Sequence, residues 1–109
     1  MTESINTENI NMEEKMKELL PVGTVVTTRM SKKKVIIIGT FQIQSEKHQV
    51  YDYMGVFYPE GFIGLEGCVL FQHQDIQEVM FKGYEDRERE VFIEFFSSAF
   101  SAAVEQVES

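Results

Sequence analysis

The fold is decided by residues 50–71, V-Y-D-Y-M-G-V-F-Y-P-E-G-F-I-G-L-E-G-C-V-L-F. The first part is rich in aromatic and β-branched residues, which favour strands. Its alternation places Tyr51 and Tyr53 on one face and leaves Asp52 as the single polar group on the other. Pro59 and Gly61 then supply a turn, and further glycines allow bulges or positive φ. The stretch predicts antiparallel strands joined by turns, and it contains no recognisable active-site motif.

Further short strands are expected on both sides of this stretch. The expected strands are residues 24–29, 34–40, 49–57, 68–71 and 76–81, with a weaker one at 41–44. The apolar run at 35–38 does not alternate, so we expect that strand to be covered on both faces in the middle of the core. The polar residues 30–33 are expected to connect the first two strands as a hairpin. These patterns predict an α+β fold with a small, strongly bent antiparallel sheet, or an SH3-like barrel, of five or six strands.

A short helix is expected after a polar N-terminal tail. Residues 1–11 carry too little apolar area to offset the entropy of ordering them, which predicts a mobile tail. Asn11 can cap a helix in which Met12, Met16 and Leu19 recur at helical spacing, and Pro21 ends it. A chain of 109 residues has room for one core, so residues 12–109 are expected to form a single domain.

Residues 85–107 predict a longer, amphipathic C-terminal helix. Its start is acidic, which suits the positive end of the helix dipole. One face collects apolar residues at helical spacing: Phe92, Phe96, Ala99, Phe100, Ala103 and Val107. We expect Phe92 and Phe96 to pack in the protein's own core, with Ile93 and Phe95 beside or off this stripe. Own-core packing and partner contact both stay open for the later apolar residues: Phe100, Ala103, Val104 and Val107.

Charge and cysteine content limit which cellular compartment and which classes of partner we expect. The net charge of −8 opposes attraction to nucleic acid phosphates and anionic lipids, so we expect neither a membrane nor, in general, a nucleic acid as partner. The sequence shows no secretory signal and no apolar run long enough to span a bilayer, which predicts a cytoplasmic protein. Cys68 is the single cysteine, and its apolar neighbours predict a buried, inert thiol.

The residues capable of catalysis or metal binding do not form a convincing constellation. His48 and His73 have no second ligand at a metal-type spacing. Cys68 with His73 suggests a nucleophile and its base, but nothing polar near Cys68 would lower the pKa of its thiol. Asp52 and Glu60 suggest an acid–base pair, yet a cross-strand hydrogen bond and a solvated turn explain them better. We therefore expect a non-enzymatic protein without metal or cofactor.

One basic cluster interrupts this acidic chain. It consists of Arg29, Lys32, Lys33 and Lys34, beside the expected hairpin connection. With nearby aromatic residues it could follow a single-stranded nucleic acid on a small barrel, or bind an acidic protein. The ordinary explanation is a solvated hairpin tip that prevents edge pairing.

Five segments in a fixed order carry a family resemblance. They are residues 19–26 (L-L-P-V-G-T-V-V), 33–39 (K-K-V-I-I-I-G), 51–56 (Y-D-Y-M-G-V), 58–61 (Y-P-E-G) and 81–86 (F-K-G-Y-E-D). Together they resemble the small bacterial family called domain of unknown function 4176. Members occur in type VII secretion gene neighbourhoods of Gram-positive bacteria, beside large LXG-type antibacterial toxins and small helical secretion partners.

The resemblance implies an accessory, chaperone-like adaptor that binds a cognate toxin before export. It supplies no catalytic motif. A toxin-neutralising immunity protein and a nucleic acid binder are the alternatives, and self-association through the C-terminal helix stays open. The residues predicted to bind the partner are Phe95, Phe100, Ala103, Val104, Val107, Arg29, Lys32 and Lys33.

Overall fold

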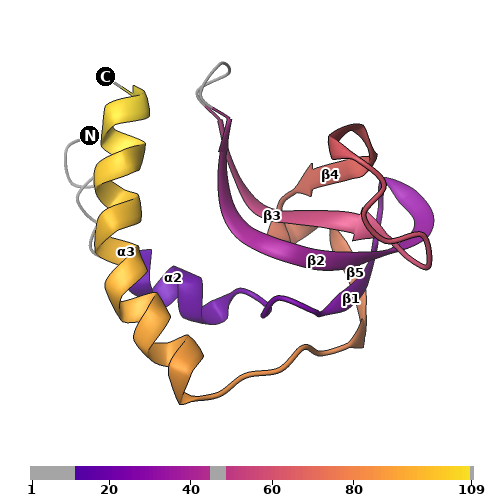
Figure 1. The fold of residues 1–109 in the computed structure, drawn as a ribbon, viewed down its shortest axis with the longest axis horizontal. Helices are drawn as coiled ribbons and strands as arrows, with labels where there is room; N and C mark the ends of the chain where they lie inside the picture. Colours follow the sequence, from indigo (N-terminus) through magenta and orange to yellow (C-terminus); the bar gives the residue numbers. More distant parts are fainter. Residues whose placement is uncertain (1–11, 45–48, 109) are drawn as a thin grey trace. The chain divides into compact units, whose positions relative to one another are not determined.

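The computed structural model describes residues 12–44 and 49–108, so the expected mobile tail at 1–11 lies outside the described residues. In chain order the elements are α2 (Met12–Glu18), β1 (Val25–Thr28), β2 (Ser31–Gln44), β3 (Gln49–Phe57), η2 (Leu65–Gly67), β4 (Cys68–Phe71), η3 (His73–Asp75), β5 (Ile76–Phe81) and α3 (Arg87–Glu108) (Figure 1). They form two compact units: a sheet unit of residues 20–84, and a helical unit built from the segments before and after it. The single domain expected over 12–109 stays a prediction.

The sheet unit confirms the predicted α+β fold with an antiparallel sheet. Its five strands lie in the order β4-β3-β2-β1-β5, and every neighbouring pair is antiparallel. The outer strands β4 and β5 do not pair with each other, so the sheet is not closed into a barrel. Figure 1 shows β2 and β3 as long, curved strands lying side by side. The SH3-like barrel was therefore the wrong alternative, and the bent open sheet the right one.

The long strand β2 differs most from the expected strands. It begins at Ser31, where the ladder with β1 pairs Thr28 with Ser31, so the connection between these strands is only Arg29 and Met30. Lysines 32–34 thus lie in a strand and not in the connector. Lysine is depleted in strands but tolerated where its head group reaches water. The strand also continues without a break to Gln44, whereas β3, β4 and β5 have the expected bounds.

The prediction that β2 is covered on both faces was wrong, although β2 is the central strand. Val35 and Ile37 are buried, Ile36 is half-buried, and Ile38 is 40% exposed. The register with β3 shifts between Ile37 and Gly39, which leaves Ile38 as the extra residue of a β-bulge. One face of the central strand therefore packs in the core, and the other remains partly open to solvent.

The core of the sheet unit forms around Gly55. Its largest fully buried side chains are Tyr53, Phe71, Ile37, Val26, Val35, Thr24 and Pro21. A Cβ atom at Gly55 would collide with the Val35 side chain and would lie 3.2 Å from Cε1 of Phe71. Only a glycine therefore lets the side chains of Val35 and Phe71 approach this closely over β3.

The helical unit packs α2 against α3 (Figure 1). Among the residues of this unit whose side chains the structure describes, Met16, Leu19, Ile93 and Ser97 are buried. The prediction that Phe92 packs in the core was wrong, since its side chain is 51% exposed, whereas the neighbouring apolar residue Ile93 is buried. Phe96 is half-buried and stacks on Phe92, with the two ring centroids 5.1 Å apart. The contact with α2, which the α3 pattern cannot reveal, selects the face with Ile93.

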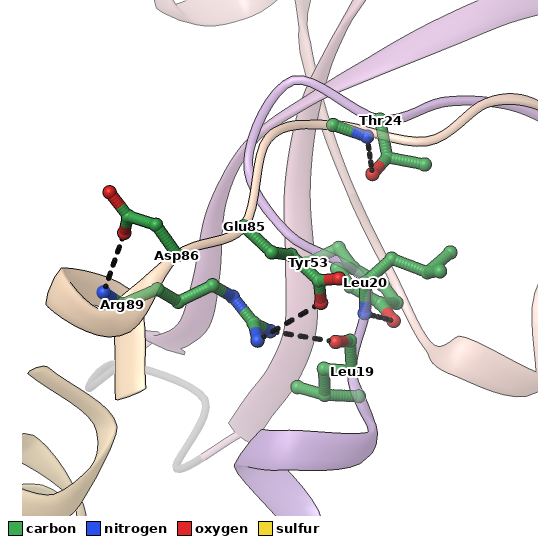
Figure 2. A network of polar contacts seen from close by, with 8 residues as sticks. Leu19, Leu20, Thr24, Tyr53, Glu85, Asp86 and Arg89 are labelled. Atoms are coloured by element: carbon green, nitrogen blue, oxygen red, sulfur yellow. Dashed lines mark hydrogen bonds and ion pairs between the residues drawn. The ribbon is translucent and has the colours of Figure 1, made fainter. Parts of the chain in front are cut away.

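The start of α3 is fixed by Asp86 and Arg89. The backbone N–H of Arg89 donates to Oδ1 of Asp86 at 3.1 Å, so Asp86 caps the helix (Figure 2). The Arg89 guanidinium lies 3.2 Å from Oε2 of Glu85 and donates to the Leu19 carbonyl at 2.9 Å. Arg89 therefore ties the first turn of α3 to the end of the α2 segment within the helical unit. No helix in the described part of the chain has the length and hydropathy needed to cross a bilayer.

Candidate partner-binding surfaces

The exposed apolar face of α3 is the clearest candidate surface on the helical unit. It is formed by Val91, Phe92 and Phe95, whose side chains are 48%, 51% and 77% exposed. Residues spaced by three and four lie on one side of a helix, so these three side chains form one patch. Exposed phenylalanines at helical spacing are typical of a surface that docks into an apolar groove or against another helix.

Acidic side chains border this apolar face. Glu88, Glu90 and Glu94 are exposed on the same helix, and Glu90 is paired with Arg87 at 2.9 Å. The complementary partner surface is therefore apolar with basic residues beside it. The backbone of α3 continues to Glu108, but the side chains of four predicted contact residues lie outside the described part: Phe100, Ala103, Val104 and Val107. Their role stays a prediction, and so does that of Phe95, whose side chain is exposed.

The basic cluster of the sheet unit makes contacts within the protein. The Arg29 guanidinium donates to the Gln74 carbonyl at 2.9 Å, and its backbone N–H donates to the Asp75 carbonyl at 3.0 Å. Lys33 forms an ion pair with Glu60, with Nζ 2.9 Å from Oε2 and both side chains half-exposed. Two of the three predicted basic contact residues therefore have structural partners. Lys32 is exposed and lines an open hollow beside Arg29.

The possible catalytic carboxylates have separate structural roles. Oδ2 of the buried Asp52 accepts a hydrogen bond from the backbone N–H of His73 at 2.8 Å, as expected for a carboxylate that links segments of the sheet. Glu60 lies in the turn after β3, where the hydrogen bond from Lys33 lowers the pKa of its carboxyl, helped by a backbone hydrogen bond. The structure thus gives each carboxylate its own partner and does not join them as an acid–base pair.

Cys68 and His73 are likewise held by different neighbours. The Cys68 thiol is directed at the Gly64 carbonyl at 3.7 Å, while Nδ1 of His73 lies 2.7 Å from the Tyr53 hydroxyl. Cys68 is half-buried, so the thiol is less buried than predicted. His48 lies outside the described residues. Within the described ranges, no group of three or more His, Cys, Asp or Glu side chains is placed to hold a metal ion.

A buried tyrosine is the polar centre that the sequence did not reveal. The Tyr53 side chain is fully buried, and its oxygen accepts a hydrogen bond from the Leu20 backbone N–H at 2.9 Å (Figure 2). Because that N–H donates to the tyrosine oxygen, the hydroxyl hydrogen is available to Nδ1 of His73. Tyr53 therefore joins β3 to the segment that enters the sheet and to η3. The position of Tyr53 in an apolar strand could have indicated that its side chain is buried. Its hydrogen-bond partners could not be predicted, because Leu20 and His73 are distant from it in sequence.

The fold and these surfaces define a class: a small α+β protein with an open, five-stranded antiparallel sheet and a C-terminal helix that exposes phenylalanines. The model of one family, Domain of unknown function (DUF4176), matches residues 19–92. This is more than half of the chain, and the chain belongs to that family. The match spans the whole sheet unit and extends past Asp86 into α3 as far as Phe92. No curated protein and no solved structure matches the chain.

Proposed function

We propose that this protein is a non-enzymatic, chaperone-like adaptor that binds a cognate LXG-type toxin of a type VII secretion system in the cytoplasm before export. The observation that carries the proposal is the exposed apolar face of α3, formed by Val91, Phe92 and Phe95. The secretion context comes from the family resemblance, which implies a gene beside those of such toxins. An adaptor for such a toxin needs a surface that is exposed when alone and covered in the complex.

The energetics of this surface suit protein binding. Transfer of a Phe side chain from water into an interface contributes on the order of 1.5–3 kcal/mol, and aromatic residues are frequent anchors of interfaces. Phe95 is 77% exposed, so most of its apolar area remains available for that transfer. The acidic border of α3 and the net charge of −8 favour a partner with basic residues around its apolar contact.

The contacts of the polar residues support a non-enzymatic role. Asp52, His73 and Glu60 are the groups most capable of acid–base chemistry, and each has a structural partner. These contacts fix the strand ends and the turn after β3. They explain the presence of the three side chains without a reaction.

Capture of the toxin tests the proposal directly. The tagged chain is co-expressed with the LXG toxin encoded beside its gene, and the toxin that co-purifies is quantified for the original protein, Phe95→Ser and Glu94→Ser. Glu94→Ser is the matched control, because it truncates an exposed neighbour on the same helix and lowers the helix propensity more than Phe95→Ser does. We expect about tenfold or more loss of affinity for Phe95→Ser, since about 1.4 kcal/mol corresponds to a factor of ten.

The same co-expression separates an adaptor from an immunity protein. An adaptor raises the soluble yield or the export of the toxin without changing the activity of its toxic domain. Suppression of that activity by the chain, with no effect on yield or export, would contradict the adaptor role. Equal capture of the toxin by Phe95→Ser and Glu94→Ser would contradict the assignment of the α3 surface.

A further inference from the structure

The sheet unit contains an apolar pocket that the α3 surface does not involve. Its volume is about 240 Å³, and it is lined by Thr28, Met30, Ser31, Val35, Phe57, Val69, Leu70 and Phe71. This is less than the roughly 300–1,000 Å³ of typical small-molecule sites, so the pocket has the size for one or two side chains. Val35 and Phe71 are buried in its lining, whereas Met30 is 57% exposed at its opening. The pocket is therefore both accessible and apolar.

The pocket follows the backbone of the outer strand β4. Three successive residues of this strand, Val69, Leu70 and Phe71, contribute to the lining. Successive side chains of a strand point to opposite faces, so a pocket that touches all three meets the strand along its backbone. A molecule in the pocket thus lies within reach of the backbone groups of β4.

The outer side of β4 offers unused backbone hydrogen bonds. In an antiparallel outer strand, alternate residues direct their N–H and C=O groups away from the neighbouring strand. Within residues 12–44 and 49–108, no backbone hydrogen bond outside the β3–β4 ladder uses Val69, Leu70 or Phe71. Such an edge pairs with an extended peptide, because only an extended backbone matches its spacing of donors and acceptors.

The loop before β4 adds exposed apolar side chains. Phe62, Ile63 and Leu65 are 62%, 67% and 77% exposed. Ile63 folds back over Gly67, where a Cβ atom would lie 2.8 Å from Cγ1 of Ile63, so the loop lies against the start of β4. The apolar character of the pocket therefore continues along the chain that leads into this strand.

The charge beside the pocket is basic. Its walls at Thr28, Met30 and Ser31 are shared with a polar hollow that includes Arg29 and Lys32. Glu78 also lines that hollow, on the side of β5. Lys32 and Lys34 are exposed along the start of β2. An incoming segment with acidic residues beside its apolar side chain is complementary to this rim.

We propose that the β4 edge and this pocket bind an extended segment of a partner protein. The segment adds a strand along β4, inserts a large aliphatic or aromatic side chain into the pocket, and places acidic residues near Lys32. The site is separate from the α3 surface and does not rest on toxin binding. Backbone pairing supplies the affinity, and the pocket selects the side chain.

Selection from a phage-displayed library of random linear peptides against the biotinylated full chain tests this proposal. We expect enriched peptides to share one large apolar residue flanked by acidic residues, without proline at its neighbours. A synthetic enriched peptide should slow hydrogen exchange of the amides of residues 69–71. Absence of any enriched peptide, or protection confined to β5 or α3, would overturn the proposal.

Two substitutions define the pocket in the same peptide assay. Val69→Trp fills the pocket, and Val79→Trp is its matched control on the other outer strand, where Val79 is 48% exposed. We expect about tenfold or greater weakening of the peptide Kd for Val69→Trp and none for Val79→Trp. Met30→Glu places a negative charge at the exposed opening, so it tests the site even where Val69→Trp unfolds. Unchanged peptide affinity in Met30→Glu would contradict the proposed site. Toxin capture through α3 does not depend on this site, so a negative result in the peptide assay leaves the proposed toxin binding standing.

Discussion

The sheet unit encloses a large apolar core, whereas the described part of the helical unit encloses a small one. The sheet unit buries a set of large side chains around Tyr53 and Phe71, and the buried Tyr53 and Asp52 each accept a hydrogen bond from a backbone N–H. The described part of the helical unit buries Ile93 and leaves Phe92 and Phe95 exposed on the same helix. The difference teaches that the larger core belongs to the sheet unit, and it is the reason why we propose a partner for the exposed phenylalanines of α3.

The largest expected effect is the destabilisation of the sheet unit when a single methyl group is added at Gly83. A Cβ atom there would collide with the Val22 carbonyl and would lie 3.0 Å from the Thr24 nitrogen, and such backbone atoms yield less readily than a side chain. Gly83 also donates its N–H to Oγ1 of the buried Thr24 at 2.9 Å. We expect Gly83→Ala to lower the free energy of unfolding by about 3 kcal/mol, the upper end for an overpacked site.

Denaturant unfolding monitored by hydrogen exchange of the sheet amides measures this effect. Gly39→Ala is the matched control, because its new methyl group would meet only the flexible end of Gln42. Equal stability of the Gly83→Ala and Gly39→Ala proteins would contradict the claim that close backbone packing at Gly83 stabilises the sheet unit.

The next effect is expected at the Tyr53 hydroxyl. Tyr53→Phe removes the acceptor of the Leu20 N–H and the partner of His73 without changing the shape of the ring. We expect a loss of about 1–3 kcal/mol in the free energy of unfolding, since polar groups lose their partners in a partly buried site. Tyr58→Phe, at a half-exposed position, should be nearly neutral in the same thermal or denaturant unfolding experiment.

The smallest effect concerns the surface ion pair of Lys33 and Glu60. We expect Lys33→Ala to raise the pKa of Glu60 toward its ordinary value, because the hydrogen bond from Lys33 is the main cause of the lowered pKa. The stabilisation from this pair is present above the ordinary pKa of glutamate and is lost as the pH falls through the lowered pKa. An NMR titration of the Glu60 carboxyl measures the change. Lys32→Ala should leave the titration unaltered, and an unchanged Glu60 pKa in Lys33→Ala would contradict the assigned cause.

Local patterns were sufficient for much of the sheet. The bounds of β3, β4 and β5 were predicted because each apolar run is flanked by turn residues. The length of β2 was not predicted, because pairing with β1 extends this strand over lysines 32–34, and lysines in a row suggest a loop when the sequence is considered alone. Its bulge at Ile38 likewise depends on the register with β3.

The surfaces were harder to predict than the strands. Phe95 and Ile93 were both placed beside or off the main apolar stripe, yet Phe95 is exposed and Ile93 is buried, because the buried face of α3 is selected by packing with α2. The Tyr53 hydrogen bonds and the pocket beside β4 join segments that are far apart in sequence. Such sites form only in the tertiary structure, so no local periodicity in the sequence predicts them.

The most direct test of the central claim measures stability and toxin binding on the same preparations of the original protein, Phe95→Ser and Glu94→Ser. We predict that both variants keep the unfolding midpoint of the original protein within the small range expected for exposed sites. Toxin affinity should fall about tenfold or more for Phe95→Ser alone. A Phe95→Ser protein that unfolds early would place Phe95 in the core, and one that is stable and binds the toxin with the original affinity would contradict the claim that α3 carries the functional surface.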